Sequence, residues 1–82
     1  MTRDELMAVI KDQLLSIAPE ADADALDPAA DLREAIDIDS MDFLNFVTAL
    51  HQRLQVDIPD ADAGKLLTLA GALDYLAGKL GV

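Results

Sequence analysis

With 82 residues, the chain can form one small hydrophobic core but not two domains, and its 52% hydrophobic content is too high for a disordered acidic tail. Sixteen acidic residues against six basic ones give a formal charge of −10, which argues against nucleic acid binding and favours partners with basic surfaces. The absence of cysteine excludes disulfides, thiolate metal sites and a protein thiol nucleophile, so any thioester chemistry needs a sulfur from a cofactor.

The sequence carries no signal for export or membrane insertion. Acidic residues follow Met1 where a signal peptide needs a basic and then an apolar run, and the uncharged stretch from Leu66 to Leu73 is far shorter than the roughly 18 residues of a spanning helix. We therefore expect a cytoplasmic protein with no membrane span. Separately, we expect a monomer that forms a single domain over residues 1–82.

The first predicted helix begins at a capping box, Thr2-Arg3-Asp4-Glu5, and ends near Ala18-Pro19. Its apolar residues recur at steps of four, four and three, which predicts one buried face: Leu6, Ile10, Leu14 and Ile17.

Periodicity is lost from Glu20 to Asp39, which predicts a long loop in which Asp27-Pro28 caps one short helical turn. A loop of about 20 residues needs anchors in so small a domain. The candidates are Leu26, Leu32 and Ile36, which would hold the following segment in a fixed place.

The same loop contains a cluster of acids, Asp22, Asp24 and Asp27, that we tested as a calcium site. An EF-hand register starting at Asp22 puts Leu26 at a ligand position and Arg33 where a bidentate Glu belongs. The register fails, so we predict no specific metal site and only diffuse attraction of cations.

The stretch Asp39-Ser40-Met41-Asp42 stands directly before an apolar run with helical spacing. It predicts a helix start with Asp39 as N-cap and Ser40 at the first helical position. There the Ser40 hydroxyl would lie beside unpaired backbone N–H groups and the positive end of the helix dipole, a favourable place for a phosphodiester. Taken alone, the tetrapeptide is better explained as a good helix cap, since such capping patterns recur in most helical proteins.

The helix that follows is predicted to run to about Leu54. One face has the spacing of a core stripe: Phe43, Phe46, Val47, Leu50 and Leu54. Met41, Leu44 and Thr48 form a second line on another side. Two interpretations stay open for this line, the edge of a wide apolar face or a docking surface for enzymes that act on Ser40.

The remaining sequence predicts an extended connection from Val56 to Pro59, a short helix from Asp60 through Leu66 or Leu67, and a last helix capped by Thr68 and stopped at Gly81. Gly71 inside that helix is tolerable if another helix packs closely, and Tyr75 is expected to pack with its hydroxyl near the surface. The predicted fold class is all-α: a small four-helix bundle of three longer helices and one short one, with a long loop between the first and second helices.

Several motifs together resemble the acyl carrier protein family over nearly the whole chain. Asp39-Ser40-Met41 matches its Asp-Ser signature, with apolar Ile36 and Leu32 four and eight residues before the serine. Three further motifs follow in the family's order and spacing: Ile58-Pro59-Asp60, Lys65-Leu66-Leu67-Thr68 and Ala72-Leu73-Asp74-Tyr75-Leu76. The resemblance implies that Ser40 carries phosphopantetheine. Asp37 departs from the pattern, since the family usually has glycine there.

A catalytic role for Ser40 would need a base within hydrogen-bond reach. The only histidine, His51, is 11 residues further along the same helix, roughly 16 Å away. We therefore predict a carrier and not an enzyme. By resemblance, a phosphopantetheinyl transferase would join the arm from coenzyme A to Ser40, and acyl intermediates would be held as thioesters for acyl-loading and acyl-processing enzymes. The alternatives are an aminoacyl or peptidyl carrier, or an unmodified helical protein-interaction module.

Partner recognition is expected at Asp39, Met41, Asp42 and Leu44. Fatty-acid carriers of the family usually have several acids along the helix after the serine, whereas the 14 residues from Phe43 through Val56 contain none. This departure predicts a dedicated fatty-acid-like or polyketide-like pathway rather than general fatty-acid synthesis.

Overall fold

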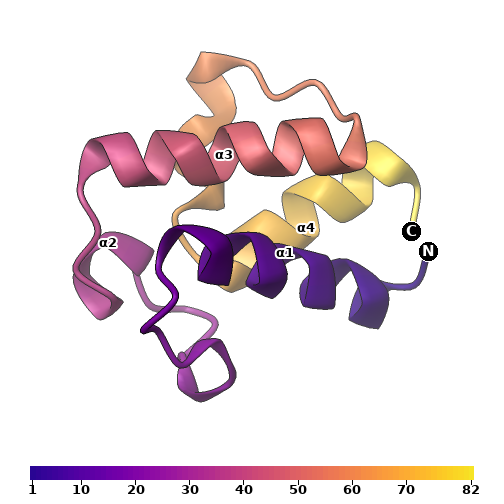
Figure 1. Ribbon diagram of the computed structural model, residues 1–82. Coiled ribbons are helices and arrows are strands. Elements are labelled where there is room, and N and C mark those ends of the chain that lie inside the picture. Colours follow the sequence, from indigo (N-terminus) through magenta and orange to yellow (C-terminus); the bar gives the residue numbers. More distant parts are fainter.

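The computed structural model describes residues 1–82, and all of its regular elements are helical, which confirms the predicted fold class. Three longer helices form the bundle: α1 (Arg3–Ile17), α3 (Ser40–Leu54) and α4 (Leu69–Leu80). Shorter elements lie in the connections: the 3-10 helix η1 (Ala23–Ala25), α2 (Leu32–Ala35) and the 3-10 helix η2 (Asp60–Leu66). Figure 1 shows that the end of α1, α2 and the start of α3 lie at one end of the bundle, with both chain termini at the other.

Local capping contacts begin the longer helices where the sequence predicts. The Thr2 hydroxyl accepts from the Glu5 backbone N–H at 3.1 Å, and the Glu5 carboxylate accepts from the Thr2 N–H at 3.2 Å. The Thr68 hydroxyl accepts from the Gly71 N–H at 2.9 Å at the start of α4. Because each contact satisfies an N–H group that has no partner within the helix, the caps fix the helix starts.

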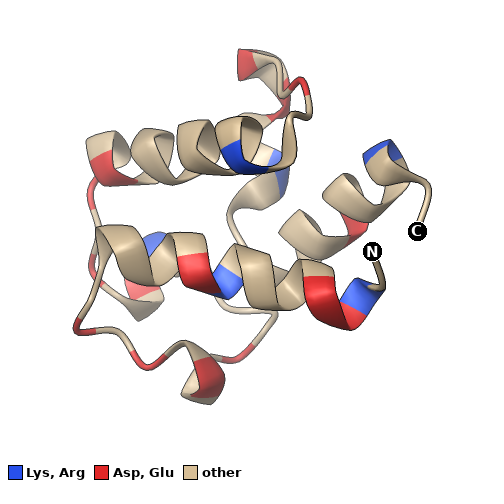
Figure 2. Ribbon diagram, turned by 45° about the vertical axis from the view of Figure 1, so that its right-hand side comes forward, with Lys and Arg blue, Asp and Glu red and all other residues tan.

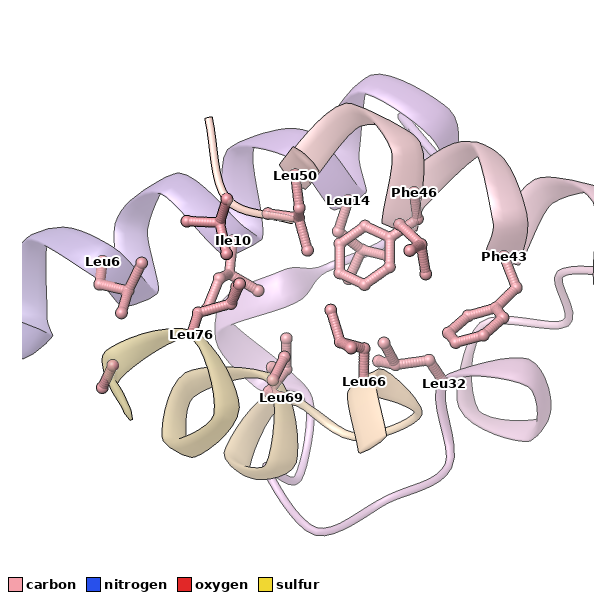
Figure 3. Packing of buried hydrophobic residues seen from close by; sticks show 14 of the residues in the cluster. Leu6, Ile10, Leu14, Leu32, Phe43, Phe46, Leu50, Leu66, Leu69 and Leu76 are labelled. Atoms are coloured by element: carbon pink, nitrogen blue, oxygen red, sulfur yellow. The ribbon is translucent and has the colours of Figure 1, made fainter. Parts of the chain in front are cut away.

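Fifteen buried hydrophobic residues form one core, drawn from α1, α2, α3, η2 and α4 and the segments between them. In Figure 3, Phe43 and Phe46 of α3 point toward Leu32 of α2 and Leu66 of η2. Phe46, Leu32 and Leu66 are fully buried, and each such side chain contributes roughly 1.5–3 kcal/mol relative to an exposed one. Leu54, predicted to belong to the stripe, is only partly buried.

The connection between α1 and α3 differs from the prediction in one respect. Asp27-Pro28 does not cap a helical turn; it opens a hydrogen-bonded turn in which the Asp27 carbonyl accepts from the Ala30 N–H at 3.0 Å. The short helices lie on either side, as η1 and α2, and begin at the caps Asp22 and Asp31.

The predicted anchors of this connection are confirmed, since Leu32 is fully buried and Leu26 and Ile36 pack partly buried against the core. Backbone hydrogen bonds from Leu32 N–H to the Leu67 carbonyl (2.8 Å) and from Ala70 N–H to the Pro28 carbonyl (2.9 Å) tie the connection to the segment that begins α4.

The short helix predicted after Pro59 is η2, a 3-10 helix that packs against α4. A Cβ atom at Gly71 would lie 2.6 Å from the Lys65 carbonyl oxygen of η2. This close approach explains a glycine inside α4, where the residue otherwise costs about 1 kcal/mol relative to alanine. None of the helices is both long and apolar enough to cross a membrane.

Candidate functional site at the start of α3

Ser40 is exposed and occupies the first position of α3, as predicted. The helix begins there because the Asp39 side chain accepts from the Asp42 N–H at 2.8 Å and the Asp39 carbonyl accepts from the Phe43 N–H at 3.0 Å. The Ser40 hydroxyl and the backbone N–H groups of Ser40 and Met41 have no hydrogen-bond partner within the chain. The site therefore presents a free hydroxyl beside two free donors at the positive end of a helix dipole.

Asp37, the position that departs from the family pattern, adopts a left-handed backbone conformation with φ of 54°. Glycine takes up this conformation without strain, and aspartate is among the few other residues that do so readily. The substitution therefore leaves the approach to Ser40 in a geometry that glycine would also adopt.

Ile38 is a core residue that the sequence analysis missed. It is 8% exposed, and it follows half-buried Ile36 and exposed Asp37. The signal that could have found it is this alternation of apolar and acidic residues directly before the helix. Its burial anchors the chain two residues before Ser40.

Met41 and Leu44 project away from the core, with 71% and 54% of their surfaces exposed. Thr48, the third member of their line, is also exposed, whereas Phe43 and Val47 of the neighbouring face are buried. The structure thus brings together Asp39, Ser40, Met41 and Leu44 on the solvent side of the first two turns of α3, with Asp42 half-buried beside them.

His51 lies on the same helix as Ser40, toward its far end, and is exposed. It is nevertheless not a freely solvated residue, because its Nδ1 lies 2.6 Å from the Val56 carbonyl oxygen just beyond the helix. The imidazole therefore binds the chain that leaves α3. This contact depends on the turn at Gln55, where φ is 54°, and no sequence pattern indicates it.

A second polar cluster lies on η2 and α4. The Tyr75 hydroxyl donates to the Asp62 carboxylate at 2.6 Å, and the Lys65 and Lys79 ammonium groups lie 5.6 and 5.5 Å from the Tyr75 ring centroid. This hydrogen bond lowers the pKa of Asp62, and together with burial it raises the pKa of Tyr75 to about 12. Tyr75 is a packing residue as expected, but its partner was not foreseen.

The three carboxylates of the acidic cluster in the loop after α1 each make a different contact. Asp22 accepts from the Ala25 N–H at 3.3 Å, Asp24 pairs with Lys11 at 3.2 Å, and Asp27 accepts from the Ala29 N–H at 2.9 Å. No group of three or more His, Asp or Glu side chains is arranged to hold a metal ion.

Comparisons with known proteins show the family of the chain. Residues 5–76 match a family model described as a phosphopantetheine attachment site. An acyl carrier protein of Campylobacter jejuni subsp. doylei is 33% identical over 75 residues, which cover 92% of this chain and 91% of the relative. The acyl carrier protein of Picosynechococcus sp. is 33% identical over 78 residues, covering 95% of this chain and 90% of the relative. The chain therefore belongs to the acyl carrier protein family, whose cofactor is phosphopantetheine and whose members are carriers and not enzymes.

Proposed function

We propose that Ser40 is the site of phosphopantetheine attachment and that the chain holds acyl intermediates on this arm. The observation that carries the proposal is the free, exposed hydroxyl at the first position of α3. The residues fit the group, because a phosphodiester at this position can accept from the Ser40 and Met41 N–H groups. A negative charge at a helix N-terminus gains typically 0.3–1 kcal/mol from the dipole.

In the attachment step the Ser40 Oγ forms a bond to the phosphorus of coenzyme A that bears the pantetheine arm. The bond from that phosphorus to the adenosine bisphosphate portion breaks, and this portion leaves with the bond's electron pair. The hydroxyl proton passes to a base of the transferase, since no side chain of this chain hydrogen-bonds to the Ser40 hydroxyl. When bound, the group supplies a terminal thiol that holds an acyl group as a thioester, a function for which the chain has no cysteine of its own.

The intact mass of the protein tests the proposal. Protein coexpressed with a phosphopantetheinyl transferase should gain the mass of one phosphopantetheine, and Ser40→Ala should gain none. Unmodified wild-type protein would instead support the alternative of an interaction module that works without the arm.

The proposed contact surface for partner enzymes comprises Asp39, Met41, Asp42 and Leu44. The two apolar side chains are exposed next to the attachment site, where burial against an enzyme would remove them from water. The two carboxylates lie within the same turn and would attract a basic enzyme surface. The expected partners are the transferase and the acyl-loading and acyl-processing enzymes.

We further propose a dedicated fatty-acid-like or polyketide-like pathway. Beyond Asp42, α3 has no acid, and the exposed residues there are uncharged or basic: Leu44, Asn45, Thr48, His51, Gln52 and Arg53. Enzymes that recognise a row of acids along this helix would find a neutral or positive surface instead. Residues 1–82 share one core and are proposed to act as one monomeric carrier domain.

A further inference from the structure

An open groove of about 700 Å³ lies beside the start of α3, where the end of α1, η1 and the end of α2 meet. Its floor is hydrophobic, since Ile17, Leu26 and Ile36 lie half-buried against the core and Ile38 is 8% exposed. Because Ile38 is two residues from Ser40, the groove and the attachment site share one segment of chain. An enzyme that reaches Ser40 therefore passes close to the groove.

The rim of the groove is acidic. Glu20, Asp22 and Asp37 line it and are exposed, and only Asp22 is engaged, as the cap of η1. The Glu20 and Asp37 side chains make no hydrogen bond or ion pair. They are thus available to a positively charged partner.

Most acidic residues of the chain lie near the groove in sequence, before or just after Ser40. Nine of the sixteen acidic residues lie in the stretch from Glu20 to Asp42, and the following 14 residues have none. In Figure 2, α3 is red only at its start and blue near its far end. Electrostatic attraction of a basic enzyme near Ser40 is therefore expected from Asp42 and the chain before Ser40, and not from the body of α3.

We propose that the groove docks the phosphopantetheinyl transferase, which places an aliphatic side chain on the floor and Lys or Arg side chains against Glu20 and Asp37. The inference rests on the proposed role of Ser40. The transferase must hold coenzyme A, with its several phosphates, next to the serine, so its active-site rim carries positive charge. It also meets the carrier before any arm is attached, so recognition depends on the protein surface alone.

Transferase kinetics with the whole apo-chain and coenzyme A test this docking, with the product followed by intact mass as the carrier concentration is varied. Glu20→Gln/Asp37→Asn neutralises the rim, keeps the Asp22 cap and leaves a residue that tolerates positive φ at position 37. Ala35→Leu independently fills the groove from an exposed position. The matched control, Asp12→Asn/Asp57→Asn, removes the same charge from exposed positions that do not line the groove.

Each groove variant should raise KM about fivefold with kcat nearly unchanged, while the control stays close to the wild type, because rim charges and anchors act on encounter and binding. Unchanged KM in both groove variants, or an equal rise in the control, would overturn the docking while leaving Ser40 modified. Failure of the wild type to be modified would instead defeat the proposed function itself.

Two other occupants give different results. The first is the acyl chain itself, which would raise the Tm of the wild type when a decanoyl group is loaded on the arm. If Ala35→Leu abolishes this rise in Tm and leaves the KM for the transferase unchanged, the groove holds the acyl chain and the inference is wrong. The inference is equally wrong if the apo-protein sediments as a dimer and Ala35→Leu makes it a monomer, because the groove then binds a second copy.

Discussion

The Asp39 carboxylate accepts a hydrogen bond from the Asp42 backbone N–H at 2.8 Å, and Ser40 lies between these two residues at the first position of α3. One contact thus fixes the backbone that carries the hydroxyl and places two negative charges beside it. The cap and the charge of Asp39 can be separated by mutation, because asparagine keeps the accepting oxygen and loses the charge.

Asp39→Ala should lower the free energy of unfolding by about 1 kcal/mol, the usual cost of losing an N-cap. Asp39→Asn should stay within about 0.3 kcal/mol of the wild type, since Asn and Asp are similar caps. Urea denaturation of the apo-protein measures both values. An equal loss in the two variants would show that the charge, and not the cap, stabilises the start of α3.

The two glycines inside α4, Gly71 half-buried and Gly78 exposed, provide a second pair of variants. At Gly71 a Cβ atom would meet the Lys65 carbonyl oxygen at 2.6 Å, whereas nothing lies within 4 Å at Gly78. Gly71→Ala should therefore destabilise the protein by about 1–3 kcal/mol through overpacking. Gly78→Ala should stabilise it by up to about 1 kcal/mol through helix propensity. Thermal melts that show the same sign for both variants would contradict the close packing of η2 on α4.

These positions also show which parts of the fold are predictable from sequence. The caps at Thr2, Asp39 and Thr68 depend on residues three positions away, so the sequence alone predicts the helix starts. At Asp27-Pro28 the signals of a helix cap and of a turn are alike, because in both the Asp carboxylate accepts from a nearby backbone N–H, here that of Ala29. The hydrogen bond from the Ala70 N–H to the Pro28 carbonyl joins segments distant in sequence and could not be predicted from local pattern.

The side-chain contacts were harder to predict for the same reason. Tyr75 and Asp62 meet across 13 residues, and His51 reaches Val56 only because the chain turns back after α3. At the candidate site, motif spacing selected Ser40 and its neighbours. The groove beside them was not predicted, because it forms only when the end of α1, η1 and the end of α2 come together.

Tyr75 can be titrated directly, because it is the only tyrosine and the chain has no tryptophan. The hydrogen bond to Asp62, together with burial, raises its pKa to about 12 from the ordinary value of 10.0. Ultraviolet absorbance read immediately after a rapid pH jump, before the chain unfolds, should give this midpoint. Asp62→Ala should return it toward 10.0, and Asp57→Ala should shift it less, since Asp57 acts only through its more distant charge. A midpoint near 10.0 in the wild type would contradict the hydrogen bond.

The hydrogen-bonded pair Tyr75 and Asp62 should make the stability of the protein depend on pH. Because the folded-state pKa of Asp62 is lowered, its contribution is present above the ordinary value of 3.8 and is lost as the pH falls through the lowered pKa. Because the folded-state pKa of Tyr75 is raised, its contribution is full below pH 10.0 and is lost as the pH rises through about 12. The difference in Tm between wild type and Tyr75→Phe should therefore be largest between these limits and shrink in acid. A difference that does not change with pH would contradict the pairing.

The absence of acids on the body of α3 should govern partner choice. When this protein and a typical acidic carrier are loaded with the same acyl groups, general fatty-acid enzymes should process the acyl groups on this protein more slowly. Arg53→Glu should raise that turnover, whereas Lys79→Glu, the same charge change on α4, should not. Equal turnover of the two carriers, or a loss on Arg53→Glu, would show that the missing acids have no bearing on the pathway.

Peptide mapping of the apo-protein after incubation with a phosphopantetheinyl transferase and coenzyme A tests the central claim most directly. The chain has only one other serine, Ser16, which is exposed like Ser40 but lies in the last turn of α1, at the negative end of that helix. The two serines thus form an internal comparison. We predict that the peptide containing Ser40 carries the whole of the phosphopantetheine and that the peptide containing Ser16 carries none. Phosphopantetheine on Ser16, or on neither serine with a transferase that modifies other carriers, would contradict the account.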